Sequence, residues 1–191
     1  MNGTRAPTGF SLSASERIER MIEKLAAIRL LVLDVDGVLT DGRFFLTERG
    51  EEYKAFDSKD GHGLRMLMKG GVRVLIISGR NSRAVDHRAK ELGIDGVHQG
   101  IRNKETLLRD ILAQERLSKE EVCCVGDDLP DLPLFSHVGV SVAVADAVPE
   151  LRQAATLTTK SRGGAGAVRE VCELILKAKG LWPYPPISSP Q

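Results

Sequence analysis

The fold of this chain is decided by residues 30–41, which read Leu30-Leu31-Val32-Leu33-Asp34-Val35-Asp36-Gly37-Val38-Leu39-Thr40-Asp41. Four apolar residues in a row are typical of a parallel strand that is buried on both faces. Because side chains alternate along a strand, Asp34 and Asp36 are expected on the same side, about 6–7 Å apart. Gly37 allows the backbone to turn sharply where the strand ends. The pattern favours a ligand site at the carboxyl end of the strand, and an ordinary acidic β-turn is the alternative.

The composition limits the class of partner. The chain has 191 residues, enough for one domain with a substantial core. Its 27 Lys and Arg against 26 Asp and Glu give a net charge of +1, which offers no electrostatic basis for binding nucleic acid or an anionic membrane. No apolar run reaches the length of a membrane span, and the N-terminus lacks the apolar core of a secretory signal. Three cysteines without metal-ligand spacing indicate buried free thiols and a cytoplasmic protein.

Strands alternate with helices along the chain, which predicts an α/β fold with a doubly wound, mostly parallel, Rossmann-like sheet. Strands are expected at 30–34, 72–77, 97–98, 122–125 and 138–142. Helices are expected at about 15–28, after a polar loop at 57–61, and at 82–92, 103–115 and 168–178. Ser13 or Ser15 can cap the first of these helices, and Ser13-x-x-Glu16 has the capping-box spacing. We expect a single domain over residues 15–179, between a flexible tail at 1–14 and a proline-rich tail at 180–191.

A β-hairpin insertion is predicted at about residues 43–56. Phe44, Phe45, Tyr53 and Phe56 lie in it and supply four of the eight aromatic residues of the chain. A two-stranded hairpin is marginally stable alone, so this concentration of aromatic side chains indicates that the hairpin packs against another surface, such as another subunit.

Three of the predicted strands end in polar residues: Asp34 and Asp36, Ser78, and Asp127. Because the carboxyl ends of parallel strands meet at one edge of a sheet, these side chains are expected to converge. Carboxylate oxygens are ligands that suit Mg²⁺. Ser78 adds a hydroxyl, and Lys104, near the start of a predicted helix, adds a compact positive charge. The combination suits a phosphate group held against a metal ion.

These motifs resemble those of the haloacid dehalogenase superfamily of phosphohydrolases and occur in its order. The four motifs are Asp34-Val-Asp36-Gly37, Ser78, Lys104 and Gly126-Asp127-Asp128-Leu-Pro-Asp131. The resemblance implies a haloacid dehalogenase-like fold in which Asp34 attacks phosphorus and forms an aspartyl-phosphate. It implies that Asp36 protonates the leaving alcohol and then activates water. Mg²⁺ would be held by Asp34, Asp127 and the backbone carbonyl of Asp36.

The other motif residues have supporting roles in this resemblance. Ser78, Lys104 and Gly37 would bind the phosphate. Asp128 would lie behind the metal ligands, and Asp131 would orient Lys104. These roles are physically reasonable, because a carboxylate nucleophile needs Mg²⁺ and a cationic side chain to offset its repulsion from phosphate.

The spacing of the motifs leaves no room for a cap domain. About thirty-five residues separate Asp41 from Ser78, and about twenty-five separate Ser78 from Lys104. The chain therefore resembles the capless subgroup and, over roughly residues 28–178, the phosphatases of 3-deoxy-D-manno-octulosonate 8-phosphate (KDO 8-phosphate). This resemblance implies Mg²⁺-dependent hydrolysis of KDO 8-phosphate to KDO and inorganic phosphate, in lipopolysaccharide precursor synthesis. It also implies a homotetramer whose neighbouring subunits close the active site.

The resemblance further implies which residues contact the sugar acid. They are Asp36, Asp57, Ser58, Lys59, Asp60, Gly61, Arg65, Arg80, Arg88 and Lys104. Arginine suits the sugar carboxylate because it binds carboxylates through two hydrogen bonds. For Arg65 and Arg88 a solvated helix face is nearly as good an interpretation. Two positions depart from the family: Asp57 replaces a frequent Asn, and Ala165 replaces a frequent arginine in the glycine loop, residues 163–166.

Three alternatives remain open at this point. The chain could act on a related nine-carbon sugar acid phosphate, or pass its phosphoryl group to an alcohol instead of water. It could also be a non-catalytic tetramerisation module, like the similar domains that are fused to sugar-acid cytidylyltransferases. Every catalytic residue type is present, which favours an enzyme.

Overall fold

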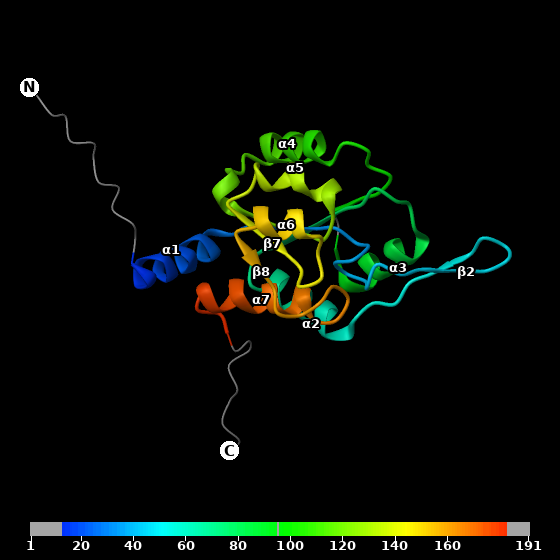
Figure 1. The fold of residues 1–191 in the computed structure, drawn as a ribbon, viewed down its shortest axis with the longest axis horizontal. Coiled ribbons are helices and arrows are strands. Elements are labelled where there is room, and N and C mark those ends of the chain that lie inside the picture. The colour runs from blue at the N-terminus through cyan, green and yellow to red at the C-terminus, as the bar shows by residue number, and fades with distance from the viewer. Residues whose placement is uncertain (1–12, 95, 183–191) are drawn as a thin grey trace, which may run out of the picture.

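A six-stranded sheet, in which all neighbouring strands are parallel, forms the centre of the molecule (Figure 1). The computed structural model describes residues 13–94 and 96–182. In spatial order the strands are β5 (Gly96–His98), β4 (Arg73–Ile77), β1 (Leu30–Leu33), β6 (Val122–Gly126), β7 (Val140–Ala143) and β8 (Leu157–Thr158).

Strand β1 is buried on both faces, as its unbroken apolar run predicts. Its alternate side chains enter the cores on the two faces of the sheet, Leu31 and Leu33 on one face and Leu30 and Val32 on the other. The last residue of β1 is in register with residues near the ends of both β4 and β6. These three strands therefore end at the same edge of the sheet.

Helices cover both faces of the sheet, with α4 and α5 on one side and α2 and α7 on the other (Figure 1). The face with α2 (Ser58–Lys69) and α7 (Ala167–Ala178) also carries α1 (Ala14–Ala27), α3 (Arg83–Leu92) and α6 (Pro149–Ala154). The opposite face carries α4 (Lys104–Glu115) and α5 (Leu132–Phe135). Two short 3₁₀ helices, Lys119–Glu121 and Leu129–Asp131, flank β6.

Polar side chains start three of these helices. Ser13 forms the predicted capping box with Glu16, and Asn103 caps α4. Asp57 caps α2, because its carboxylate accepts two backbone N–H groups of the following turn. The predicted polar loop at 57–61 is therefore wrong beyond its first residue, since α2 begins at residue 58.

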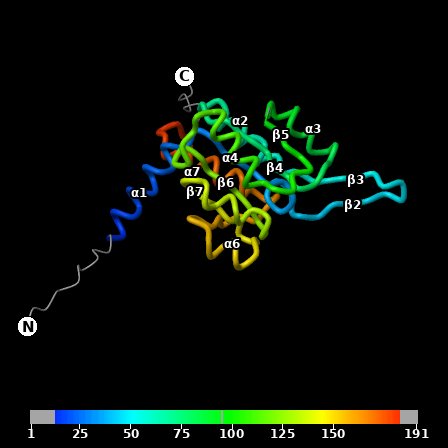
Figure 2. Tube along the Cα trace, turned by 90° about the horizontal axis from the view of Figure 1, so that it is seen from above, coloured from blue at the N-terminus to red at the C-terminus, as the bar shows by residue number. Residues whose placement is uncertain are grey.

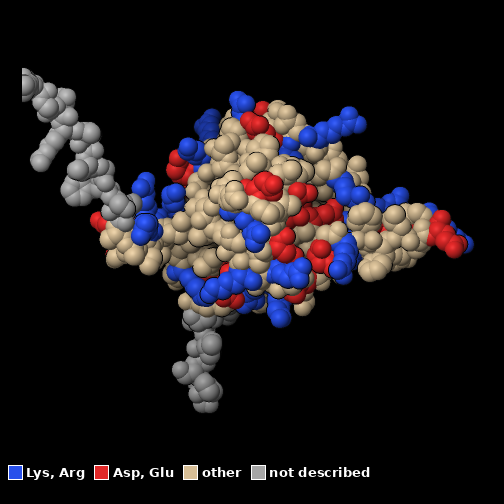
Figure 3. Space-filling model, viewed as in Figure 1, with Lys and Arg blue, Asp and Glu red and all other residues tan. Residues whose placement is uncertain are grey.

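Strands β2 (Phe45–Leu46) and β3 (Glu52–Tyr53) form an antiparallel hairpin that projects away from the body (Figures 1 and 2). The paired segments cover only part of the hairpin predicted at about residues 43–56. Phe44, Phe45, Leu46 and Tyr53 are between 38% and 68% exposed. Most of the visible surface of the arm is uncharged, and charged side chains gather at its tip (Figure 3).

The predicted doubly wound α/β fold with a hairpin insertion and no cap domain is confirmed, with differences at the ends of elements. The helix predicted from residue 15 begins at Ala14, and the strand predicted from residue 138 begins at Val140. Strand β8 and helices α5 and α6 are too short to show a periodic pattern and were not predicted. The tails at 1–12 and 183–191 lie outside the described residues. Within residues 13–94 and 96–182, no helix has the length and apolarity needed to cross a membrane.

Candidate active site

A cavity of about 260 Å³ lies at the carboxyl ends of β1, β4 and β6. Acidic side chains are visible on the body beside the base of the hairpin (Figure 3). The residues that line the cavity are Asp34, Asp36, Ser78, Gly79, Arg80, Lys104, Asp127, Asp128, Pro130 and Asp131. The fold thus brings together side chains from all four sequence motifs.

Asp34 is a buried carboxylate that follows β1 directly. Continued alternation of the strand directs it to the face covered by α4, whose first residue is Lys104. The Lys104 Nζ atom lies 2.6 Å from Asp34 Oδ1 and 2.7 Å from Asp131 Oδ1. These side chains are between 2% and 10% exposed, so the ion pairs are shielded from water. Lys104 therefore bridges the two carboxylates.

Burial and neighbouring charges shift the pKa values of Asp34 and Lys104. Burial and repulsion from Asp131 raise the pKa of Asp34 to about 6, although Lys104 acts in the opposite direction. For Lys104, burial alone would lower the pKa, but attraction to Asp131 and Asp34 outweighs it and the pKa rises. The ammonium group therefore keeps its proton near neutral pH.

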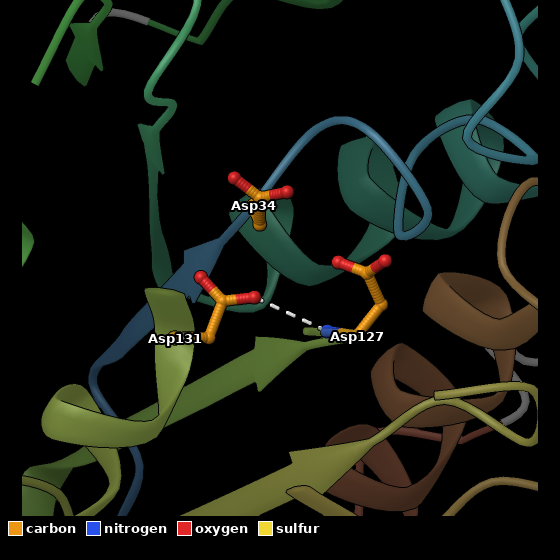
Figure 4. A group of neighbouring side chains, drawn as sticks. All are labelled: Asp34, Asp127 and Asp131. Carbon is orange, nitrogen blue, oxygen red and sulfur yellow. Dashed lines mark hydrogen bonds between the residues drawn. The ribbon is translucent and has the colours of Figure 1, made fainter. Parts of the chain in front are cut away.

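Asp34, Asp127 and Asp131 form a cluster of neighbouring carboxylates (Figure 4). One oxygen from each lies within 4.8 Å of the others. The backbone N–H of Asp127 donates to Asp131 Oδ2 at 3.1 Å. Burial, together with repulsion from Asp34 and Asp131, raises the pKa of Asp127 to about 8. Three ionised carboxylates would carry more charge than Lys104 offsets, so the cluster fits a hard divalent cation such as Mg²⁺.

Asp36 lines the same cavity, but its carboxylate has other partners. Strand β1 ends at Leu33 and Asp36 lies in a turn, so the alternation that predicted a common side with Asp34 does not extend to it. Asp36 Oδ1 pairs with Lys54 Nζ, and Asp36 Oδ2 lies 3.6 Å from Arg80 Nε. The side chain of Asp36 is thus absent from the carboxylate cluster described above, which leaves its backbone carbonyl as the predicted metal contact.

Sequence reasoning missed Lys54 and Glu52 as site residues. They lie two positions apart at the end of the hairpin, and this spacing places two charges on one face of an extended segment. The spacing indicates a charged face on this segment, but it does not indicate which side chain that face meets.

The turn after β1 is packed against the glycine loop. At Gly37 φ is +92°, and a Cβ atom there would lie 2.0 Å from Asp127 Oδ2, so glycine leaves room for this carboxylate. A Cβ atom on Gly163 would lie 1.6 Å from the carbonyl oxygen of Gly37. The N–H of Gly164 donates to the carbonyl of Val38 at 2.9 Å. The glycine loop therefore supports the turn through backbone contacts.

The remaining motif residues are placed as follows. Ser78 lines the cavity, and its Oγ accepts the N–H of Arg80 at 3.3 Å. Gly37, a predicted phosphate ligand, donates its N–H to Thr40 Oγ1 at 3.4 Å. Asp128 lines the cavity and accepts the N–H of the next residue.

The predicted sugar-acid residues at the start of α2 do not line this cavity. Asp57 caps the helix and Lys59 is exposed. Asp60 is 1% exposed, and its carboxylate accepts the N–H groups of Arg169 at 2.7 Å and Gly166 at 3.3 Å. In this chain Asp60 therefore anchors the start of α7.

Arg65 and Arg88 line a separate cavity of about 250 Å³, together with Ser58 and Gly61. Arg65 donates to the carbonyl of Glu91 at 2.7 Å, and Arg88 pairs with the Glu91 carboxylate at 2.9 Å. Of the three predicted sugar-acid arginines, Arg80 alone lines the cavity that holds Asp34.

Several known proteins are similar to this chain in sequence and in structure. Residues 97–171 match the haloacid dehalogenase-like hydrolase family. The chain is 48% identical over 160 residues to the 3-deoxy-D-manno-octulosonate 8-phosphate phosphatase KdsC of Escherichia coli (strain K12), covering 84% of this chain and 85% of that protein.

Two crystal structures of such phosphatases superpose on most of the chain. The enzyme from Yersinia pestis is 46% identical with a TM-score of 0.81, covering 83% of this chain and 86% of that one. The enzyme from Moraxella catarrhalis, in complex with magnesium, phosphate and KDO, is 40% identical with a TM-score of 0.83, covering 86% and 94%. The chain therefore belongs to the 3-deoxy-D-manno-octulosonate 8-phosphate phosphatase family of haloacid dehalogenase-like hydrolases.

Proposed function

We propose that this chain hydrolyses KDO 8-phosphate to KDO and inorganic phosphate with the help of Mg²⁺. The observation that carries the proposal is the placement of Asp34, a buried carboxylate 2.6 Å from Lys104 and clustered with Asp127 and Asp131. The similar protein from Moraxella catarrhalis binds magnesium, phosphate and KDO together, which supports the same ligands here.

Asp34 is the proposed nucleophile. One of its oxygens attacks phosphorus, the bond from phosphorus to the sugar oxygen breaks, and an aspartyl-phosphate forms. Lys104 lies against the attacking carboxylate and offsets negative charge as the anionic phosphate approaches. Asp131 holds Lys104 from the other side, so the ammonium group stays directed at the cavity.

Asp36 is the proposed acid and base. It donates a proton to the leaving sugar oxygen, then takes one from the water that attacks phosphorus and restores Asp34. Asp34, Asp127 and the backbone carbonyl of Asp36 are proposed to hold Mg²⁺, whose charge offsets that of the phosphate. Ser78 and Gly37 are proposed phosphate ligands, and Asp128 remains a proposed support for the metal ligands.

We also propose a homotetramer in which neighbouring subunits close the cavity. Exposed apolar side chains on the projecting hairpin support it, because contiguous apolar surface of this kind marks sites of association. Within the described residues, no cap domain lies over the cavity. Ser58, Lys59, Arg65 and Arg88 would then contact the sugar acid bound to a neighbouring subunit, whereas Asp60 is buried and anchors α7. Three buried free cysteines support a cytoplasmic location.

Phosphate release from a panel of esters tests the activity. The panel contains KDO 8-phosphate, a nine-carbon sugar acid 9-phosphate and a sugar phosphate without a carboxylate, each with Mg²⁺ and with a chelator. We expect KDO 8-phosphate to give the highest kcat/KM, and only with Mg²⁺. A preference for the nine-carbon acid would correct the substrate, and absence of turnover on every ester would contradict the proposal in favour of a non-catalytic module.

A further inference from the structure

Four charged side chains form a closed ring between the cavity and the hairpin. Lys54 Nζ pairs with Asp36 Oδ1 and lies 3.4 Å from Glu52 Oε1. Arg80 Nη2 lies 2.8 Å from Glu52 Oε2, and Arg80 Nε lies 3.6 Å from Asp36 Oδ2. Acid and base alternate, so each charge lies between two opposite charges.

The ring is shielded from water on its hairpin side. The Lys54 side chain is 0% exposed, and those of Glu52 and Asp36 are 15% and 21% exposed, whereas Arg80 on the other side of the ring is 47% exposed. The centre of the Phe44 ring lies 5.3 Å from Lys54 Nζ and 4.1 Å from Arg80 Cζ, so one aromatic ring lies beside both cations. Ion pairs that lose contact with water hold their geometry more strictly than exposed pairs, which are screened and mobile.

We propose that Lys54 is a positioning residue for Asp36, and that Glu52 in turn holds Lys54 and Arg80. The inference rests on the proposed phosphatase reaction, in which Asp36 transfers protons. Lys54 holds Oδ1, so the Asp36 carboxylate is turned away from the cluster around Asp34. Oδ2 has only the longer contact of 3.6 Å with Arg80 Nε, which leaves it as the oxygen for the leaving group. Proton transfer requires the carboxylate oxygen to lie within hydrogen-bond reach of the leaving group, and an error of about 1 Å in its placement can cost about 100-fold in rate.

The ring also connects the hairpin to the chemistry. Lys54 and Glu52 belong to the returning strand of the hairpin and its extension, and Phe44 immediately precedes the outgoing strand. A displacement of the hairpin would therefore shift Asp36 through its contact with Lys54 and through its contact with Arg80, which Glu52 holds. No comparable link joins the hairpin to Asp34, whose partner Lys104 lies on α4 within the part of the chain described.

Substrates with different leaving groups test the proposal. A sugar alcohol is a poor leaving group that needs a proton, whereas p-nitrophenolate leaves without one. Because kcat/KM reports the steps up to the first bond cleavage, misplacement of Asp36 should affect the two esters differently. Lys54→Met keeps an unbranched side chain that is one atom shorter and removes its charge. We expect it to lower kcat/KM for KDO 8-phosphate by about 10–100-fold. The value for p-nitrophenyl phosphate should change less than about threefold, since no acid is required.

Lys177→Met is the matched control. Lys177 Nζ pairs with Glu173 at 3.1 Å and lies 5.3 Å from the ring of Trp182, so it makes the same kinds of contact on α7, away from the cavity. This variant should behave as wild type with both esters. Lys54→Arg keeps a cation and should recover most of the lost kcat/KM, which a purely structural role of the lysine stem would not predict.

Each outcome separates the inference from the function on which it rests. An equal loss with both esters, or no loss with KDO 8-phosphate, would overturn the positioning role while leaving the phosphatase intact. A wild-type chain inactive on every ester would overturn the function and the inference together. If Lys54→Met does not fold, Glu52→Gln is measured on the same pair and should show the same selective loss, and an equal loss there would refute the proposal.

Discussion

Replacing Gly163 with alanine should displace the turn that carries Asp36 without unfolding the chain. A Cβ atom at position 163 would lie 1.6 Å from the carbonyl oxygen of Gly37 and 2.5 Å from its carbonyl carbon. Both are backbone atoms, so no side-chain rotation relieves the contact. Ordinary van der Waals contact begins near 3.4 Å, and the two loops must therefore separate by more than about 1 Å.

We expect Gly163→Ala to lose most of its catalytic activity but only part of its stability. Overpacking of this kind lowers the free energy of unfolding by about 1–3 kcal/mol. A displacement of about 1 Å at a reacting group costs about 100-fold in rate. We expect Gly163→Ala to remain folded at 25 °C while its kcat/KM for KDO 8-phosphate falls by about 100-fold or more.

Gly71→Ala provides the control. Gly71 has φ +83° and no atom within 4 Å of a Cβ position, so alanine there adds backbone strain of about 1–2 kcal/mol without a clash. Thermal unfolding and phosphate-release kinetics are measured for both variants. Gly71→Ala should lose stability and keep its kcat/KM. A folded Gly163→Ala protein with kcat/KM within threefold of wild type would refute the claim that the glycine loop supports the catalytic turn.

Three further predictions follow from charge and exposure. Lys104→Met leaves two buried carboxylates, Asp34 and Asp131, without their cation. Urea denaturation at pH 7 should therefore give a free energy of unfolding about 3–5 kcal/mol lower than that of the wild type. An unchanged midpoint would contradict the buried ion pairs. Because the pKa of Asp127 is raised to about 8, the metal-free folded state holds a proton that the unfolded state releases, and its contribution to stability is lost as pH rises from about 4 to about 8. The gain in melting temperature on adding Mg²⁺, which displaces that proton, should then be larger at about pH 8 than at about pH 5.5, and an equal gain would exclude Asp127 as the linked group. Phe45→Glu, on the exposed hairpin, should lower turnover and reduce the mass measured by light scattering below that of four 20.8 kDa chains. An intact tetramer would place the interface elsewhere.

The sheet and the catalytic edge could be predicted because their signals are local. The apolar run of β1 needs no partner to identify it, and the polar residues Asp34, Ser78 and Asp127 each follow directly after a buried strand. Once the strands are known to be parallel, their carboxyl ends must meet at one edge. Asn103 similarly marks the start of α4 and so the place of Lys104.

The contacts that sequence reasoning did not find depend on segments far apart in the chain. Asp60 looks like one more residue of a polar loop, yet its partners on the glycine loop and α7 lie more than 100 residues later. Nothing near Asp36 indicates that its carboxylate turns toward Lys54, because that contact depends on how the hairpin returns to the body. Local patterns specify elements, whereas long-range packing decides which side chains meet.

The most direct measurement of the central claim is chemical trapping of the phosphorylated enzyme. The Mg²⁺-loaded protein is mixed with KDO 8-phosphate, quenched during turnover and treated with borohydride, which reduces an aspartyl-phosphate to homoserine. Peptide mass spectrometry should find homoserine at position 34, only when substrate is present and never in Asp34→Asn, which should be folded and inactive. Full turnover with an unmodified Asp34, or near-normal rates in Asp34→Asn, would show that this carboxylate is not the nucleophile.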